Sequence, residues 1–160
     1  MRKHLLTVSI CLLALTLSGF AQTKKSAMKK AAPAGPAPDA ALMQKIWDGW
    51  ATLDPANVAK FYAQGPHVFF DITPLKYNNW DEYAKGFAPI AATYKSAKFT
   101  VDGPEVHPHG DLVWATAIIK NEMTTKAGKV EMGAFRWTVI WGNEDGKWLI
   151  VHEHVSAPLQ

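Results

Sequence analysis

The feature that most constrains the fold is a predicted β-hairpin near the end of the chain, over Phe135 to Pro158. Its first run, Phe135 to Trp141, is almost wholly β-branched or aromatic, and its second, Trp148 to Val155, alternates large apolar and polar side chains. An Asp-Gly pair, Asp145-Gly146, lies between the two runs, and such a pair is a strong hairpin signal. We therefore expect these two strands to pair and to form one wall of a small domain.

The beginning of the chain has the pattern of a secretory signal. Arg2, Lys3 and His4 precede an apolar run of 13 residues, 5–17, which is too short to span a bilayer as a helix. Small residues then stand at the positions expected for cleavage after Ala21. We interpret residues 1–21 as a signal peptide and expect a periplasmic or secreted protein without a stable membrane span. The alternative is that the segment remains as an anchor.

Residues 22–38 have the composition of a flexible basic linker, with four lysines among Ala, Pro, Gly and Ser. Binding of this linker to anionic lipid or cell-wall polymer is the alternative. Residues 39–160 form the expected single domain and hold 11 Lys and Arg against 14 Asp and Glu. The excess positive charge therefore belongs to the first 38 residues, which argues against a nucleic-acid partner for the domain.

Cysteine use excludes several kinds of chemistry. Cys11 is the single cysteine of the chain, and it lies inside the predicted signal. The mature chain would then have no disulfide, no thiol nucleophile and no thiolate metal site. The expected domain must be held together by its core, and it is rich in tryptophan, with all seven Trp between Trp47 and Trp148.

Three helices are predicted before the main sheet. Asp39 caps a helix to about Leu53, with apolar residues at three- and four-residue steps. Asp54-Pro55 starts a second helix, which stops at Gly65-Pro66. Asn79 caps a third, from Trp80 to about Tyr94, which Pro89 ends early or kinks.

Two short strands are predicted between the second and third helices, and the remaining strands follow the third helix. The predicted strands are Val68–Ile72 with a short partner at Leu75–Tyr77, Phe99–Val106 with a bulge at Gly103-Pro104, Leu112–Thr125, Val130–Trp141 and Trp148 to about Ser156. Successive strands with short turns form an antiparallel meander, and the helices must cover one of its faces. The expected fold class is α+β, with three helices packed on a strongly bent, mostly antiparallel sheet and a pocket between the two layers.

The motif Arg136-x-Thr138, followed by Asp145-Gly146-x-Trp148 and Val151-His152-x-His154-x-Ser156, resembles the SnoaL-like branch of the nuclear transport factor 2-like superfamily. The same ending resembles the association domain of calcium/calmodulin-dependent protein kinase. The resemblance covers roughly residues 39–158 and implies a cone with a pocket at its open end, often dimerised through the sheet. Members include steroid isomerases, polyketide cyclases, dehydratases and binding or assembly domains, so the fold does not fix an activity.

Side-chain parity along the strands sorts the residues into two faces. By the resemblance, Glu153 and Val155 face the pocket together with Leu149 and Val151, and His152 and His154 lie on the outer face. The remaining expectations place Phe135, Trp137, Val139, Trp141, Trp114, Thr116, Ile118 and Lys120 inward, and Arg136 and Thr138 outward. A single bulge would reverse any of these assignments.

Asp71 is the sharpest catalytic candidate, because it follows an apolar strand where the steroid isomerases carry their general base. A carboxylate walled by Phe and Trp is poorly solvated, which would raise its pKa toward neutrality. Tyr62, Tyr83 or Lys120 would then polarise the substrate. The places that match the family's oxyanion hole hold Ile46 or Trp47, and Trp137 or a neighbour, and neither place supplies the expected acidic O–H. The alternative is that Asp71 accepts a hydrogen bond in the turn at Thr73.

Other polar residues have structural and functional interpretations side by side. Glu153 is a buried carboxylate that pairs with Lys120 or takes part in catalysis. Arg136, the only arginine after Arg2, needs a carboxylate partner or an anionic ligand. The pairs His152/His154 and His107/His109 lack flanking ligands, so we expect no metal and no cofactor.

The aromatic side chains either line a pocket for a flat apolar ligand or form an ordinary core. The candidate ligand-binding residues are Trp47, Trp50, Phe69, Trp80, Phe87, Trp114, Lys120, Phe135, Trp137 and Glu153. The leading hypothesis is a pocket that binds a small, largely apolar molecule, in a chain that is expected to form a homodimer. The alternatives are an isomerase, cyclase or dehydratase with Asp71 as base, and an assembly module acting through the outer face that bears Arg136, His152 and His154.

Overall fold

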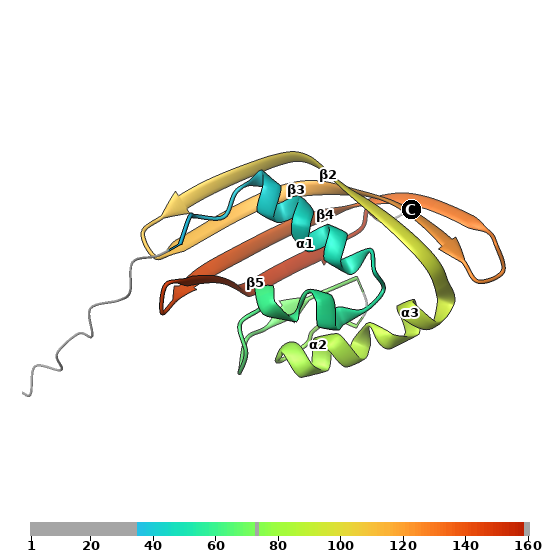
Figure 1. Ribbon diagram of the computed structural model, residues 1–160, viewed down its shortest axis with the longest axis horizontal. Coiled ribbons are helices and arrows are strands. Elements are labelled where there is room, and N and C mark those ends of the chain that lie inside the picture. Colours follow the sequence, from blue (N-terminus) through green and yellow to red (C-terminus); the bar gives the residue numbers. More distant parts are fainter. Residues whose placement is uncertain (1–34, 73, 159–160) are drawn as a thin grey trace, which may run out of the picture. The chain divides into compact units, whose positions relative to one another are not determined.

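The computed structural model describes residues 35–72 and 74–158. The predicted signal peptide and residues 22–34 of the predicted linker lie outside the described residues. Within the described ranges, no helix combines the length and the apolar character needed to cross a membrane. Figure 1 shows the arrangement of the elements.

The first helix, α1 (Ala40–Trp50), begins as the sequence predicts, because the Asp39 carboxylate accepts a hydrogen bond of 2.8 Å from the Leu42 amide. It ends before the predicted position. Leu53 has a φ of +61°, a left-handed conformation that no helix residue adopts. The buried face of α1 carries Met43, Ile46, Trp47 and Trp50; the helical period predicts these four and Leu42, which is half-buried.

The predicted second α-helix is wrong. The segment instead forms two 3₁₀ turns, η1 (Pro55–Asn57) and η2 (Ala59–Phe61). Asp54 does cap this segment, and its carboxylate accepts from the Ala56 amide at 2.9 Å. The chain then extends at Tyr62, which forms a bridge to the last strand and cannot continue a helix.

The predicted third helix is broken into α2 (Trp80–Gly86) and α3 (Ala88–Thr93). The break comes just before Pro89, which has no amide hydrogen to donate. Asn79 caps α2 as predicted, and its side chain accepts from the Glu82 amide at 2.8 Å.

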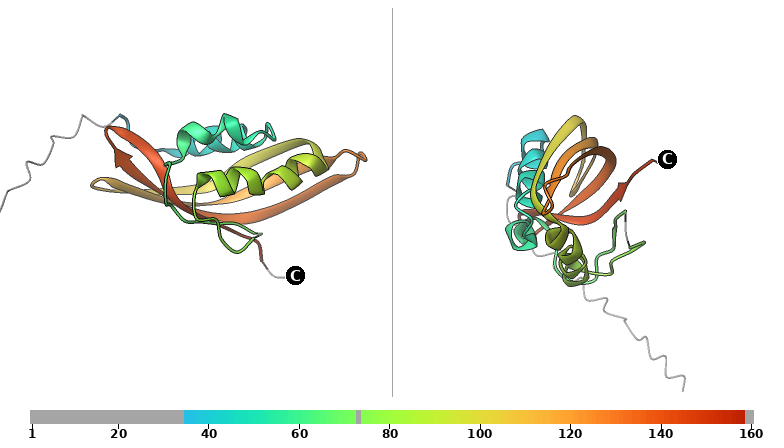
Figure 2. Two further views of the ribbon diagram at one scale, coloured as in Figure 1. Left: turned by 90° about the horizontal axis from the view of Figure 1, so that it is seen from below. Right: turned by 90° about the vertical axis from the view of Figure 1, so that its right-hand side faces the viewer.

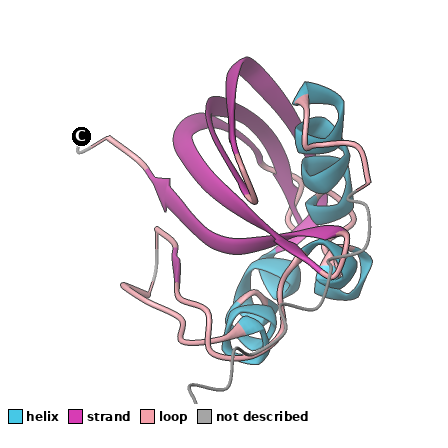
Figure 3. Cartoon of the chain, turned by 90° about the vertical axis from the view of Figure 1, so that its left-hand side faces the viewer, coloured by secondary structure: helices cyan, strands magenta, loops and turns pink. Residues whose placement is uncertain are grey.

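The sheet has five strands in the order β1-β5-β4-β3-β2, so the predicted α+β class is confirmed. The strands are β1 (Phe69–Phe70), β2 (Tyr94–His109), β3 (Leu112–Thr125), β4 (Val130–Glu144) and β5 (Lys147–Ser156). β1 pairs parallel with β5, and the other neighbours are antiparallel. Figures 2 and 3 show the long strands curling, with the helices along one side of the curl.

The predicted hairpin between β4 and β5 closes through the two-residue loop Asp145-Gly146, where both residues have positive φ, 49° and 85°. That combination is typical of the turns that match the twist of paired strands. The chain preceding α1 lies against this turn, because the Trp148 indole N–H donates to the Gly35 carbonyl at 3.2 Å.

The turn between β3 and β4 is one residue longer than predicted. Thr124 pairs with Val130, and Thr125 has no partner in β4, so five residues (125–129) rather than four lie between the last paired residues; Trp137 therefore lies opposite Ala117. A shift of one residue exchanges the two faces of a strand. The inward face of β3 therefore carries Val113, Ala115, Ala117 and Ile119, and the predicted inward set of Trp114, Thr116, Ile118 and Lys120 is wrong.

A bulge in β5 corrects a second assignment. Ile140 pairs with His152 and Trp141 with Ile150, which leaves Val151 without a partner in β4. Ile150 is consequently buried, although the alternating pattern placed Leu149 and Val151 on that face. Beyond the bulge, Glu153 and Val155 face the core as predicted.

Candidate functional site

A cavity of about 210 Å³ lies between the helices and the inner face of the sheet. Its wall is mostly aromatic and aliphatic. The lining residues are Trp47, Trp50, Asp71, Ile72, Tyr83, Phe87, Ile90, Phe99, Asn121, Met123, Phe135 and Val155. These residues come from α1, α2, α3, the segment after β1 and four strands, so no single element determines the shape of the cavity.

Helix α1 supplies the centre of the wall. The Trp47 ring packs against Phe99, Phe135 and Trp137 at centroid distances of 5.1, 5.2 and 5.4 Å. Two strands, β2 and β4, therefore hold this indole in place. Because rings fixed in this way cannot collapse inward easily, the packing helps to keep the cavity open.

Asp71 is the carboxylate of the cavity wall. Its Oδ1 accepts a hydrogen bond of 2.7 Å from the amide of Ile72, and burial raises the pKa of Asp71 above its ordinary value. The bond from the amide opposes that shift but is the smaller effect. Thr73, the predicted alternative partner, lies outside the described residues. Asp71 is thus a base with reduced solvation facing an apolar space.

Two further polar groups line the cavity, the Tyr83 phenol and the Asn121 amide. Asn121 was missed by the sequence analysis because the wrong register of β3 assigned it to the outer face. The alternation Ile119, Asn121, Met123 marks it as inward once the turn length is known. The cavity therefore combines an apolar wall with a few polar contacts, as ligand pockets usually do.

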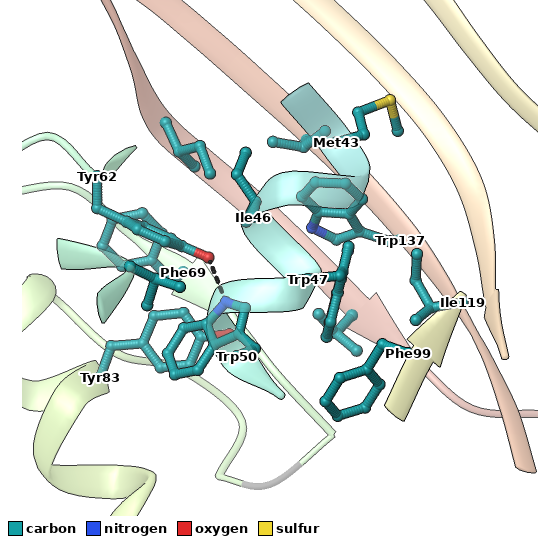
Figure 4. Packing of buried hydrophobic residues seen from close by; sticks show 14 of the residues in the cluster. Met43, Ile46, Trp47, Trp50, Tyr62, Phe69, Tyr83, Phe99, Ile119 and Trp137 are labelled. Atoms are coloured by element: carbon teal, nitrogen blue, oxygen red, sulfur yellow. Dashed lines mark hydrogen bonds between the residues drawn. The ribbon is translucent and has the colours of Figure 1, made fainter. Parts of the chain in front are cut away.

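Glu153 lies beside the cavity wall in a network of hydrogen bonds, and it is only 1% exposed. The Tyr62 hydroxyl is 3.1 Å from both of its carboxylate oxygens, and the Trp137 indole N–H donates to Oε2 at 2.9 Å. Tyr83 is also near enough to this carboxylate to lower its pKa. The Trp50 indole N–H in turn donates to the Tyr62 oxygen at 3.0 Å, as Figure 4 shows.

Burial raises the pKa of Glu153 from 4.5 to about 7, and the negative charge of Asp71 adds to this shift. The hydrogen bonds from Trp137 and Tyr62, together with the nearby Tyr83, lower the pKa of Glu153, but their combined effect is smaller than that of burial. The predicted partner of Glu153 is wrong, because the Lys120 ammonium is exposed and pairs instead with Asp102 at 2.7 Å. Among the described residues, Glu153 is surrounded by neutral donors and no cation.

The sequence-predicted ligand residues fall into three groups. Trp47, Trp50, Phe87 and Phe135 line the cavity. Phe69, Trp80 and Trp137 are buried in the core and lie outside the set of lining residues, as do Tyr62 and Glu153. Trp114 and Lys120 are on the opposite face of the sheet, 44% exposed in the case of Trp114, so their assignment to the pocket is wrong.

The outer face carries the remaining candidates. Arg136 is exposed, and none of the described carboxylates forms an ion pair with it, contrary to the predicted pairing. The Nδ1 atom of His152 lies 2.7 Å from the Val68 carbonyl, and the edge of Phe70 meets both His152 and His154. His152 thus fixes the segment ahead of β1 to β5.

No group of three or more His, Cys, Asp or Glu side chains that could hold a metal ion is found in the described parts of the chain. The chemistry available at the cavity is that of Asp71 and the network beside it. A carboxylate whose pKa is raised by burial can exchange a proton with a bound molecule.

Solved structures share this fold at low sequence identity. An NTF2-like superfamily protein from Salmonella enterica serovar Typhimurium is 18% identical, with a TM-score of 0.65 over 75% of this chain and 91% of that chain. The association domain of the calcium/calmodulin-dependent kinase CaMKII from C. elegans is 16% identical, with a TM-score of 0.59 over 73% and 91%. A candidate dehydratase of the NTF2-like family from Streptomyces avermitilis is 14% identical, with a TM-score of 0.63 over 75% and 92%.

No curated protein matches the chain. The family described as the SnoaL-like domain matches residues 40–160, which is most of the chain and includes every element described above. The order of the elements, the curled sheet and this match agree with the resemblance seen in the final hairpin. The chain belongs to the SnoaL-like domain family, and it shares the fold of the NTF2-like structures.

Proposed function

We propose that this protein binds a small, largely apolar, ring-sized molecule in the cavity between its helices and its sheet. The observation that carries the proposal is the cavity itself, about 210 Å³ of space with an aromatic wall and few polar groups. For scale, an apolar cavity of about 150 Å³ holds benzene. The size fits one ring with a few substituents.

The polar groups at the wall favour a ligand with a single polar end. Asp71 accepts hydrogen bonds when ionised, and Asn121 both donates and accepts. A fully polar ligand would leave many of its groups unpaired against Trp and Phe, which costs free energy. A ring with one hydroxyl or carbonyl group meets both demands.

The test is a titration of residues 35–158 with toluene. Binding is monitored by tryptophan fluorescence, since Trp47 and Trp50 both line the cavity. We expect saturable quenching. Ile90→Trp, which fills the wall from a half-buried position, should weaken binding about tenfold or more. Ile118→Trp adds the same ring on the exposed outer face and should leave binding unchanged. Absence of saturable binding in all three proteins would refute the proposal.

A second candidate function is acid–base catalysis with Asp71 as the base. Its support is specific: a carboxylate with a raised pKa faces an apolar cavity. The Streptomyces avermitilis neighbour is named as a dehydratase family member, which is a property of that protein. Removal of a proton next to a carbonyl group is the step that such a base would perform.

Exchange of the α-hydrogens of cyclopentanone in D₂O, measured by NMR, tests this candidate. An active base should accelerate exchange above the buffer rate, and Asp71→Asn should return the rate to that of buffer. Exchange that is equally fast in Asp71→Asn would remove Asp71 from the role of base. No acceleration by the unmodified protein would remove the enzyme hypothesis for this class of ketone.

A third candidate, assembly through the outer face, is supported by the exposed side chains of Trp114, Ile118 and Met132 on β3 and β4. We propose a homodimer through this face, which Trp114→Glu should dissociate in sedimentation velocity; a monomeric unmodified protein would contradict it.

Export remains a proposal from the sequence of residues 1–21. The mass of the mature chain tests it, and we expect cleavage after Ala21.

A further inference from the structure

We propose that the cavity prefers a ring-sized molecule with a positive charge, a small cyclic or aromatic amine whose ammonium group pairs with Asp71. This inference rests on the proposed function, since it names the ligand class of the same cavity. It goes further, because a neutral ring satisfies the aromatic wall but leaves the carboxylate without a counter-charge.

The Asp71 carboxylate lines the cavity and has no cation beside it. Its Oδ1 accepts from the neutral amide of Ile72 at 2.7 Å, and the described residues offer it no second hydrogen bond and no ion pair. None of the residues that line the cavity is Lys, Arg or His. An ionised carboxylate has about four acceptor positions, so most of those on Asp71 remain for a ligand.

The rest of the wall also suits a cation. Aromatic ring faces carry partial negative charge and attract ammonium groups. The lining residues with such rings are Trp47, Trp50, Phe87, Phe99, Phe135 and Tyr83. They are packed on one another, with the rings of Trp50 and Phe87 at a centroid distance of 4.8 Å and those of Trp47 and Phe135 at 5.2 Å. The cavity therefore offers an ammonium group a carboxylate and several ring faces held in place.

Exposure along the wall gives the bound molecule a direction. Asp71 is half-buried and its neighbour Ile72 is 51% exposed, whereas Trp50 and Val155 are only 3% and 4% exposed. The carboxylate thus lies on the solvent side of the cavity. A bound amine places its ring among the buried aromatic side chains and its ammonium group near the opening. Because the ammonium group keeps part of its hydration there, the cost of burying its charge is reduced.

The chemistry of Asp71 distinguishes an amine from other polar ends. A carbonyl group only accepts hydrogen bonds, so it can pair with the Asn121 amide but not with an ionised carboxylate. A hydroxyl group donates a single hydrogen and carries no charge. An ammonium group donates up to three and carries the opposite charge, and such charge-assisted bonds are the stronger kind.

The experiment compares three molecules with one ring each and different charges. Toluene is neutral, benzylamine is a cation and benzoate is an anion at about pH 7. Each is titrated into the protein by calorimetry at about 0.15 M salt, which screens long-range attraction. We expect benzylamine to bind about tenfold or more tightly than toluene, the size of a hydrogen bond to a charged group, and benzoate to bind more weakly than toluene.

Two matched variants locate the preference. Asp71→Asn keeps the shape of the side chain and removes its charge, and it should lower the ratio of benzylamine to toluene affinity about tenfold. Asp111→Asn removes the same charge from the exposed turn between β2 and β3, away from the cavity wall, and should retain the ratio of the unmodified protein.

The outcomes distinguish this inference from the function on which it rests. If none of the three molecules binds, the ring-binding proposal is refuted. If toluene binds and benzylamine binds no more tightly, the preference for a cation is overturned and ring binding stands. A preference that persists in Asp71→Asn, or that is lost equally in Asp111→Asn, overturns the role of Asp71, because the overall negative charge of the domain would then be its source. The three ligands decide the preference in the unmodified protein even if a variant does not fold.

Discussion

The Tyr62 hydroxyl lies 3.1 Å from both carboxylate oxygens of Glu153, although 91 positions separate the two residues in the chain. Tyr62 follows η2, and Glu153 lies in β5 next to the bulge. This contact joins the helical layer to the sheet at a point where both are fully buried. The stability and the pH response of the domain should both depend on it.

The first prediction concerns Glu153 and pH. A folded-state pKa of about 7, against 4.5, means that the unfolded chain releases its proton first, so this group lowers stability as the pH rises from about 4.5 to about 7. Glu153→Gln removes the effect. We expect the variant to match the unmodified protein near pH 4.5 and to be more stable by up to about 3 kcal/mol at pH 8. Urea unfolding across this range measures the difference, and a constant difference would contradict the assignment.

Removal of the Tyr62 hydroxyl should be costly. Tyr62→Phe leaves the buried Trp50 N–H without its acceptor and takes one donor from Glu153. We expect a loss of about 1–3 kcal/mol in the free energy of unfolding. Tyr94→Phe is the matched control, because its hydroxyl bonds Glu131 at 2.7 Å nearer to solvent, and it should cost less than about 1 kcal/mol. Equal losses in the two variants would show that the network adds nothing.

The sequence pattern predicted the strands of the meander well because turn residues and alternation mark them locally. β3 was predicted with its observed bounds, and the Asp145-Gly146 turn was predicted from its residue types. The assignment of side chains to the inward or outward face depended on the exact turn length and on bulges. One additional residue in the turn after Thr124 reversed β3, and one unpaired residue, Val151, reversed the start of β5.

The network around Glu153 could be predicted only in part. Strand parity together with the family resemblance placed Glu153 inward but did not indicate the partners that it has, since Tyr62 and Trp50 come from distant segments whose approach depends on tertiary packing. The sequence analysis paired Glu153 with Lys120 because the register of β3 was off by one residue. The prediction for Asp71 did not depend on the register between strands, and its place at the cavity wall follows from its position after β1.

The direction of the stability change in Gly86→Ala tests the packing around this residue. In an ordinary helix position, replacing Gly by Ala stabilises by about 1 kcal/mol. A Cβ at Gly86 would instead lie within van der Waals overlap of the Tyr77 ring, 2.4 Å from its Cε1 atom. Because Tyr77 is buried and stacks on Tyr83, it cannot move freely, and Gly86→Ala should destabilise by about 1–3 kcal/mol. Thermal unfolding measures the change, and a stabilised variant would contradict this packing.

Substitutions on the outer face of the sheet should not change ligand binding. Lys120→Ala breaks only the exposed pair with Asp102, and we expect less than about 1 kcal/mol of stability change and unchanged toluene affinity. Phe135→Ala is the contrasting variant at the cavity wall, where the lost ring contacts with Trp47 and Phe99 should weaken toluene binding severalfold. A larger effect on toluene binding from Lys120→Ala than from Phe135→Ala would reverse the assignment of the two faces.

The account depends on an open apolar cavity inside the layered fold, and xenon tests it directly. Crystals of residues 35–158 under xenon pressure should show one xenon atom bounded by Trp50, Phe87 and Phe135, since empty apolar cavities take up this gas. Side chains that close the space, or ordered waters that fill it and exclude xenon, would contradict the existence of a binding cavity at this position.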